Sequence, residues 1–227
     1  MENILVIRLT NLGDAVLSIP AIRALRKKYP KAKITVLTSE RTSSIYKECP
    51  YVYNTLILQF GSPKRILFFL LNLAKDCLQL IKKLRKEKFD LGIDLETYYR
   101  ITPIILYLSG CKKRIGFTTK GEGRGFLYTH QVSYDEDKHE VECLLDLVSA
   151  AGAEIEDKRL EFNYFTKEEK FIKNYLKWKG IQDEDFLVAI HPGSGEGWAI
   201  KRWSVERYAE IGRILVHKYG IKIIIIG

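Results

Sequence analysis

The stretch from Ile4 to Pro20, ILVIRLTNLGDAVLSIP, places one carboxylate where chemistry is expected. Residues 4–7 form a continuous apolar run typical of a buried parallel strand, and from Ala15 onward apolar residues recur at helical spacing. Asp14 is therefore predicted near the start of a helix at the carboxyl end of a strand, where open parallel sheets carry their active sites. Two roles fit this carboxylate: a helix N-cap for free backbone N–H groups, or a general base.

A second segment, HPGSGEGWAIKRW, begins at His191 and follows an apolar run over 186–190. Its glycines allow backbone N–H groups to approach a phosphate closely, and Ser194 adds a hydroxyl donor. Lys201 and Arg202 then place two cations beside the loop. The segment predicts a loop that binds a phosphate or diphosphate.

Both segments are similar to those of a known family. RLTNLGDAVLSIPAIRALRKKYPKAKITVLT and HPGSGEGWAIKRWSVERYAEIGRIL resemble the ADP-heptose:lipopolysaccharide heptosyltransferases, glycosyltransferase family 9. Shorter stretches between them, DLGIDL from Asp90, RIGF from Arg114 and HEVECLLDL from His139, are similar as well. The resemblance extends along the whole chain and is most specific at both ends. It implies an α/β fold of the GT-B type, with two Rossmann-like domains and parallel sheets.

The resemblance also implies roles for individual residues. Asp14 would be the general base that takes a proton from the acceptor hydroxyl, and direct attack would invert the anomeric carbon. Lys201 would neutralise the leaving diphosphate, with Arg202 as the alternative, while Ser194 and Gly195 bind the same diphosphate. Contacts to the acceptor or within the loops are expected from five further residues: Arg8, Asn11, Gly13, Asp94 and His191.

The implied reaction transfers a heptose from ADP-heptose to a lipid-linked saccharide of the lipopolysaccharide inner core, at the inner membrane surface. No Asp-x-Asp pair or carboxylate cluster stands in a setting suited to a divalent ion, which agrees with the metal-independent mechanism that the resemblance implies. We therefore expect no cofactor, and the nucleotide sugar would be a substrate.

Several alternatives stay open on the residues themselves. Asp94 ends an apolar run over 91–95 and either contacts the acceptor or caps the next helix. His191 either binds a phosphate or has a structural role. A non-catalytic nucleotide- or sugar-phosphate-binding protein would keep the glycine-rich loop but would not need Asp14, and a GT-B transferase could use another nucleotide sugar. An oxidoreductase is disfavoured because Leu-Gly-Asp stands where Gly-x-Gly-x-x-Gly is expected.

Composition restricts the partners and the location. The 227 residues are 46% hydrophobic and 29% charged, enough for a sizeable core, and the net charge of +9 favours an anionic partner. No nucleic-acid-binding module accompanies the basic residues. The four cysteines are too scattered for a zinc pattern and are expected to be reduced thiols. We find no basic segment typical of a cleavable signal ahead of Ile4, and expect a cytoplasmic protein, peripheral at most to the inner face of the membrane.

Strand-like and helix-like patterns alternate, which predicts βαβ units. Strands are expected at 4–7, 34–37, 55–58, 91–95, 114–117, 160–164, 186–190 and 221–226, and helices at 15–28, 64–86, 98–108, 138–151, 167–179 and 205–219. We expect an acceptor-side domain at 1–165, a linker helix and connection at 166–185, and a nucleotide-sugar-binding domain from 186. Its 42 residues are fewer than the roughly 100 that such a domain usually needs, so we expect a truncated second domain.

The predicted helix over 64–86 is apolar at its start and basic at its end. Burial of Phe68, Leu71 and Leu78 against the sheet would explain the pattern. Alternatively, Leu67 and Phe69 would contact an anionic membrane surface.

Overall fold

The structure is a computed structural model, in which the chain forms two compact units, Met1–Tyr164 (unit 1) and Phe165–Gly227 (unit 2). It describes residues 1–58, 66–118, 123, 125–164 and 166–227, without the side chains of 66–75 and 196–198.

Unit 1 is built on a parallel sheet. Over the described residues the sheet has six strands: β1 (Asn3–Ile7), β2 (Lys33–Ser39), β3 (Asn54–Leu58), β4 (Leu91–Asp94), β5 (Lys113–Thr118) and β6 (His130–Ser133). Their order across the sheet is β3-β2-β1-β4-β5-β6, and every pairing is parallel. The chain therefore builds outward from β1 to β3 and then restarts beside β1 with β4. The predicted alternation of strands and helices is confirmed.

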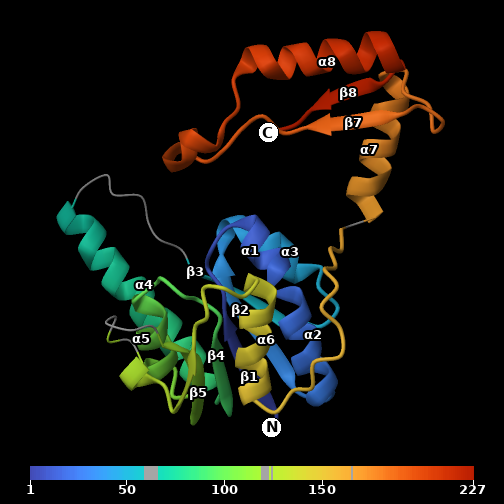
Figure 1. The fold of residues 1–227 in the computed structure, drawn as a ribbon. Helices are drawn as coiled ribbons and strands as arrows, with labels where there is room; N and C mark the ends of the chain where they lie inside the picture. The colour runs from blue at the N-terminus through green and yellow to red at the C-terminus, as the bar shows by residue number, and fades with distance from the viewer. Residues whose placement is uncertain (59–65, 119–122, 124, 165) are drawn as a thin grey trace. The chain divides into compact units, whose positions relative to one another are not determined.

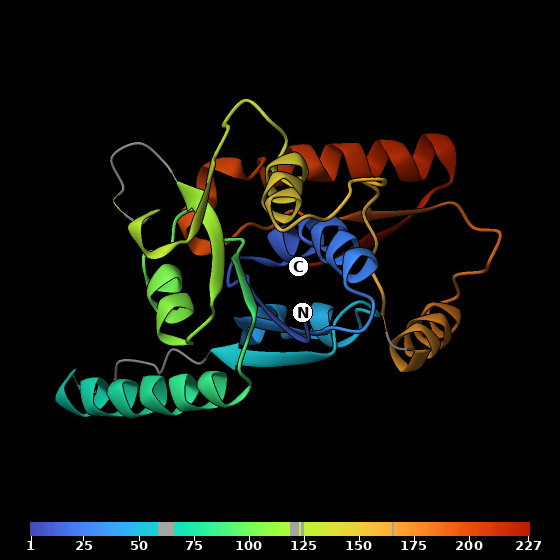
Figure 2. The ribbon, with the colours of Figure 1, turned by 90° about the horizontal axis from the view of Figure 1, so that it is seen from below.

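Helices cover both faces of this sheet because alternate side chains of β1 point to opposite sides. Ile4 and Val6 belong to a core cluster with α1 (Leu12–Leu17), α2 (Ile19–Lys28), α3 (Ser43–Lys47) and α6 (Glu140–Ala150). Leu5 and Ile7 belong to a second cluster with α4 (Ile66–Lys86) and α5 (Ile101–Leu108). Figures 1 and 2 show α2 and α6 on one side of the sheet, with α4 and α5 on the other.

The predicted single helix over 15–28 is two helices, α1 and α2, separated at Ser18. Pro20, the second residue of α2, has no N–H to donate to the carbonyl of Val16, so the helical hydrogen bonding is interrupted there. Ser18 is fully buried, and its hydroxyl is 2.9 Å from the hydroxyl of Tyr46 in α3. The interruption makes α1 a short element that carries Asp14.

The predicted strand over 160–164 is wrong, and a strand that we did not predict is present. Residues 160–164 are irregular, and the apolar members of their alternation, Leu160, Phe162 and Tyr164, are exposed. Strand β6, by contrast, is short, mostly polar and mostly exposed at the edge of the sheet.

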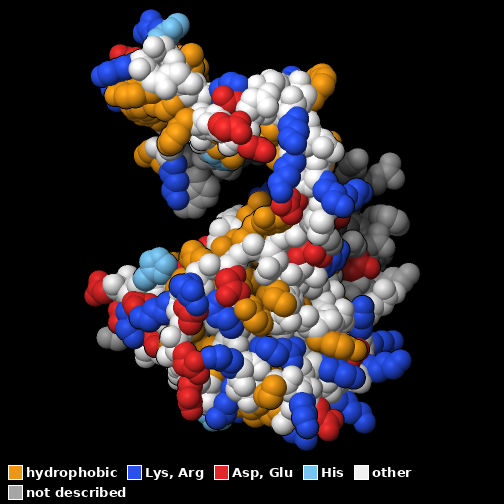
Figure 3. Space-filling view, turned by 90° about the vertical axis from the view of Figure 1, so that its right-hand side faces the viewer, with side chains coloured by type: hydrophobic (Ala, Val, Ile, Leu, Met, Phe, Trp, Pro, Cys, Tyr) orange, Lys and Arg blue, Asp and Glu red, His pale blue; other side chains and the backbone are white. Residues whose placement is uncertain are grey.

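Arg23 of α2 holds this irregular segment against unit 1. Its guanidinium donates to Glu161 Oε1 at 2.6 Å, and to the carbonyl oxygens of Asp157 and Arg159 at 3.1 and 3.0 Å. The hydroxyl of Tyr51 donates to the other oxygen of Glu161 at 2.7 Å. Figure 3 shows Lys and Arg side chains interspersed with Asp and Glu on this face of unit 1, so the basic residues are not gathered into one field there.

Unit 2 contains the parallel pair β7 (Leu187–Ile190) and β8 (Lys222–Ile225). It also contains the helices α7 (Thr166–Trp178) and α8 (Val205–Tyr219) and the 3₁₀ helix η3 (Glu196–Lys201). Gly220 ends α8 with φ of 64°, the left-handed conformation that glycine adopts without strain. Strand β7 leads directly into the glycine-rich loop.

One expectation about helix α4 is wrong, and two others concern side chains that the structure does not describe. Leu78 is 62% exposed and does not pack on the sheet. The side chains at 67–69 and 71, on which the remaining core and membrane expectations depend, lie outside the described residues. Among the helices of the described residues, none has the length and hydrophobicity needed to cross a bilayer.

The four cysteines are free thiols, as expected. Cys49, Cys111 and Cys143 are buried, and Cys77 is exposed. Burial raises the pKa of Cys111 to about 11, so this thiol stays protonated at neutral pH.

Gly116→Ala should destabilise unit 1. Gly116 of β5 pairs with Asp94 of β4, and a Cβ there would lie 2.2 Å from Cζ of the Tyr128 ring. We expect a loss of about 1–3 kcal/mol in the free energy of unfolding, measured by urea denaturation, because an extra methyl group overpacks a buried site. The matched control is Gly13→Ala, whose Cβ would meet nothing within 4 Å. A Gly116→Ala protein as stable as the wild type would contradict the described packing of Tyr128.

Candidate functional site

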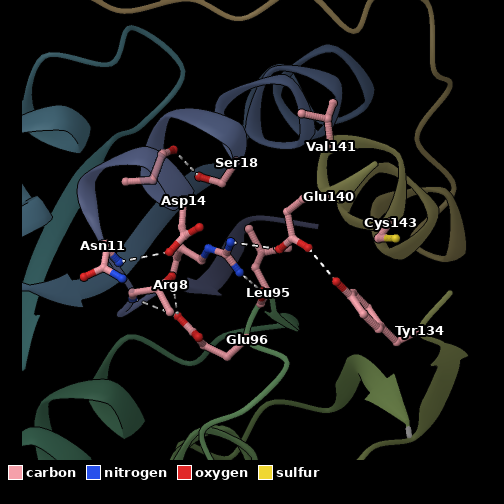
Figure 4. A network of polar contacts seen from close by, with 12 residues as sticks. Arg8, Asn11, Asp14, Ser18, Leu95, Glu96, Tyr134, Glu140, Val141 and Cys143 are labelled. Atoms are coloured by element: carbon pink, nitrogen blue, oxygen red, sulfur yellow. Dashed lines mark hydrogen bonds and ion pairs between the residues drawn. The ribbon is translucent and has the colours of Figure 1, made fainter. Parts of the chain in front are cut away.

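The carboxyl ends of β1 and β4 lie side by side at the point where strand order reverses. In open parallel sheets such a switch point leaves a crevice between the two loops that leave it. Here the loops are the turn after Ile7, which leads to α1, and the turn after Asp94, which leads to α5. Figure 4 shows side chains from these turns and from the start of α6 pointing toward one another.

Arg8 connects these three segments. It is 3% exposed, and its guanidinium donates one hydrogen bond from Nη1 to the carbonyl oxygen of Leu95. From Nη2 it donates to Glu140 Oε1 at 2.9 Å, in an ion pair. A buried charge is strongly destabilising unless it is paired and hydrogen-bonded, so the turn and the helix must keep these positions. Arg8 was predicted as an acceptor or loop contact, and its buried position makes it a loop contact.

Glu96, in the turn after β4, binds the turn after β1. Its Oε1 accepts hydrogen bonds from the backbone N–H of Leu9, and from the N–H and hydroxyl of Thr10 at 3.1 and 3.3 Å. The side chain is completely buried, and this burial raises the pKa of the carboxyl group, although the nearby Arg8 charge partly opposes the shift. Arg8 and Glu96 thus join the two turns by reciprocal hydrogen bonds.

Asp94 supports the same turn and does not cap the next helix. Its Oδ1 accepts from the backbone N–H of Glu96 at 3.0 Å, and its Oδ2 accepts from the hydroxyl of Tyr128 at 2.6 Å. The residue is fully buried, and α5 begins at Ile101 with Arg100 as its N-cap. The helix-cap prediction for Asp94 is therefore wrong.

Asp14 is the third residue of α1, and the N-cap of this helix is Asn11. Asp14 Oδ2 accepts a hydrogen bond from the backbone N–H of Asn11 at 3.2 Å, as Figure 4 shows. This is the capping-box position, in which the side chain reaches back to the N-cap. The side chain is half-buried, while Asn11 and Gly13 beside it are exposed. Asp14 is therefore not the N-cap, and its other oxygen, Oδ1, accepts no hydrogen bond from the described residues.

Glu140 fixes the start of α6 next to this turn. Its Oε1 pairs with Arg8, and its Oε2 accepts from the hydroxyl of Tyr134 at 2.9 Å. Burial, followed by this bond to a carboxylate, raises the pKa of Tyr134, so the phenol keeps its proton at neutral pH. The polar groups around Asp14 are thus held in place, while Asp14 itself stays accessible. This is what a carboxylate needs if it is to accept a proton from a bound hydroxyl.

In unit 2, the glycine-rich loop follows β7 and is closed by Arg202. Arg202 donates from Nε to Ser194 Oγ and from Nη2 to the carbonyl oxygen of Ser194, both at 2.9 Å. The structure therefore brings together two of the predicted diphosphate ligands, Ser194 and Arg202. Gly195 ends the loop as the N-cap of η3, and Lys201 is the last residue of η3.

His191, the first loop residue after β7, is exposed, and so is Lys201. An exposed imidazole and ammonium beside flexible glycine backbone can reach an anionic ligand from solvent. Trp203 packs edge-to-face on Tyr208 of α8, with ring centroids 5.3 Å apart.

Sequence reasoning missed two residues that organise the switch point. Glu96 was not predicted as a site residue, and Glu140 appeared only within the HEVECLLDL stretch. Their partners, Leu9 and Arg8, lie 87 and 132 residues away in sequence. No local spacing signals contacts at such separations, so only the sheet order could reveal them.

Comparison with known proteins agrees with this architecture. The sequence model of glycosyltransferase family 9 (heptosyltransferase) matches residues 77–227, about two thirds of the chain. Lipopolysaccharide heptosyltransferase 3 of Escherichia coli is 25% identical over 219 residues, which cover 94% of this chain and 60% of that protein. The chain spans about three fifths of the length of the curated relatives it matches.

Solved structures match the whole chain. The glycosyltransferase family 9 protein of Veillonella parvula gives a TM-score of 0.82 at 19% identity, covering 100% of this chain and 62% of that one. The E. coli ADP-heptose lipopolysaccharide heptosyltransferase II gives 0.75 at 22% identity, covering 100% and 64%. The predicted GT-B-type α/β fold is confirmed.

Glu96 should make stability fall as pH rises. Its pKa is raised in the folded state, so the unfolded state loses the proton first, and this favours unfolding. We expect the free energy of unfolding of the wild type, relative to Glu96→Gln, to decrease above the ordinary glutamate pKa of about 4.3 until the raised pKa is passed. Urea denaturation across this pH range measures it.

The control is Glu142→Gln. The hydrogen bond from Lys158 lowers the pKa of Glu142, so its contribution has the opposite sign. It is present above the ordinary pKa and lost as pH falls through the lowered one. If the difference for Glu96 were flat, or rose with pH like that of Glu142, Glu96 would not be buried as described.

Proposed function

The chain belongs to glycosyltransferase family 9, and from this premise we propose that the protein is an inverting transferase that moves a heptose from ADP-heptose to a lipopolysaccharide inner-core saccharide. The observation that carries the proposal is the position of Asp14. It is a half-buried carboxylate at the switch point of the unit 1 sheet, with one oxygen bound to Asn11 and the other open to a ligand.

In the proposed reaction, Asp14 removes the proton from the acceptor hydroxyl as the hydroxyl oxygen attacks the anomeric carbon. The bond from that carbon to the donor diphosphate breaks on the opposite face, so the configuration inverts. An ionised carboxylate held beside the hydroxyl can accept this proton. The fixed turn around Arg8 and Glu96 supports this role, because a general base must be held within hydrogen-bond reach of its substrate.

The loop of unit 2 would hold the leaving ADP. We propose that Ser194, Gly195 and backbone N–H groups bind the diphosphate, and that Lys201 neutralises the charge that develops on it. The two contacts from Arg202 to Ser194 support a role for Arg202 in shaping this loop. We propose that the transfer needs no metal ion.

The lipid anchor of the proposed acceptor places the reaction at the inner face of the cytoplasmic membrane. The net charge of +9 supports contact with anionic lipid as well as with the donor diphosphate. The curated relative from E. coli bears the name of a lipopolysaccharide heptosyltransferase, which supports the same acceptor class.

Asp14→Asn should slow transfer by about 100-fold to 10,000-fold, the usual effect of losing a positioned base. The amide oxygen still accepts the hydrogen bond from Asn11, so folding and ADP affinity should be nearly unchanged. Release of ADP from ADP-heptose in the presence of the saccharide acceptor measures the rate.

The matched control is Asp137→Asn, the same substitution at an exposed carboxylate outside the switch point. It should leave the rate unchanged. If Asp14→Asn kept most of its turnover, Asp14 would be a helix-capping residue alone.

Lys201→Ala should weaken ADP binding by about tenfold to a hundredfold, the worth of a charge-assisted hydrogen bond. Arg202→Ala should weaken it less, because Arg202 acts through Ser194. Isothermal titration of ADP measures both.

Arg202→Lys separates the two roles of a cation at this position. A lysine keeps the charge but cannot make the two-point contact to Ser194, so we expect it to behave like Arg202→Ala. Wild-type affinity in Arg202→Lys would show that Arg202 binds the diphosphate by charge. Wild-type affinity in Lys201→Ala would remove Lys201 from the site.

A further inference from the structure

The outer face of α5 is apolar where a surface helix is normally polar. Thr102, Pro103, Ile105 and Leu106 are its buried side. The side that faces solvent carries Ile101, Ile104, Tyr107 and Leu108, which are 39, 42, 52 and 37% exposed. Spacing of three to four residues places these four side chains in one row. A helix that is apolar all round normally lies in a core or in contact with lipid.

The segment that carries this row has basic residues and no acidic ones. From Thr97 to Arg114 the chain contains no acidic residue and four basic ones. Lys113 donates to the carbonyl oxygen of Ala150 in α6, on the other face of the sheet, so Arg100, Lys112 and Arg114 are the cations left for this side. The guanidinium of Arg114 lies 5.4 Å from the ring centre of Tyr107. At the end of α4, Arg85 donates to the carbonyl oxygen of Leu108 at 2.8 Å, which brings the basic last turn of α4 to the end of α5. The row therefore has a basic rim.

The row begins beside the switch point. Strand β4 ends at Asp94, and Glu96 binds the turn that leads to Asp14. Tyr98 and Tyr99, which follow directly, are 75 and 45% exposed, and the carbonyl oxygen of Tyr99 accepts from Thr102 in the first turn of α5. Tyrosines with exposed rings are typical of segments that lie at the level of lipid headgroups.

We propose that α5 lies against an anionic phospholipid surface, with its apolar row in the headgroup region and its basic rim on the lipid phosphates. An aliphatic and tyrosine row flanked by cations is the combination that binds membrane interfaces. A second copy of this chain is a poor occupant, because two basic rims would then face each other. That the bilayer also carries the acceptor rests on the function proposed above; the lipid contact itself does not.

The test is flotation with vesicles of phosphatidylethanolamine and phosphatidylglycerol, compared with phosphatidylcholine vesicles, without any substrate. The wild type should bind the anionic vesicles and bind phosphatidylcholine weakly. Ile104→Glu should lower the bound fraction about tenfold, because it replaces an aliphatic side chain that would enter the lipid by a negative charge that the anionic surface repels. Ile104→Gln, which adds no charge, should lower it less. Thermal unfolding checks that both variants are folded.

Ile155→Glu is the matched control, since Ile155 is 40% exposed and lies outside α5. It should bind vesicles like the wild type. Equal binding by Ile104→Glu and Ile155→Glu, or no binding by the wild type, would overturn the proposal. A transfer assay with a water-soluble saccharide acceptor separates the two proposals, because Ile104→Glu should transfer to this acceptor at the wild-type rate. If no nucleotide sugar were turned over while α5 still controlled vesicle binding, the proposed function alone would fail.

Discussion

The site depends on one buried charge, the guanidinium of Arg8. Removing it from water is unfavourable, and the carbonyl oxygen of Leu95 and the carboxylate of Glu140 compensate for that cost. These partners belong to the turn after β4 and to the first residue of α6. The buried charge is therefore compensated only when the two turns and the start of α6 hold these relative positions. Asp14 lies six residues after Arg8, in the first turn of α1, so its position is fixed together with that of the turn.

The two units contribute different chemistry to the proposed reaction. Unit 1 holds a carboxylate on a short helix, isolated by the interruption at Pro20, so that its orientation follows the turn rather than a long helix. Unit 2 holds a glycine-rich loop that Arg202 closes through Ser194. A base is useful only if it is positioned, whereas an anion-binding loop must admit its ligand. The buried network in unit 1 and the exposed loop in unit 2 agree with these separate requirements.

Local patterns predicted most of the fold but little of the network around the site. The apolar runs of β1, β2 and β4 and the spacing in α2 and α6 are dictated by burial on a parallel sheet, so they are visible in sequence. Strand β6 was not predicted because an exposed edge strand needs no apolar alternation. The alternation in 160–164 was misleading because Glu161, not the apolar residues, contacts unit 1. Glu96 and Glu140 act through contacts that exist only once the strands are ordered. Asp14 was predicted because its strand, turn and helix follow one another directly in the sequence.

The most direct test of the account is the structure of the protein with a saccharide acceptor bound. We expect the hydroxyl to be glycosylated to lie within hydrogen-bond distance, about 2.6–3.2 Å, of Asp14 Oδ1, while Oδ2 keeps its bond to Asn11. An acceptor hydroxyl that is held by another carboxylate, with Asp14 out of reach, would contradict the assignment of Asp14 as the base.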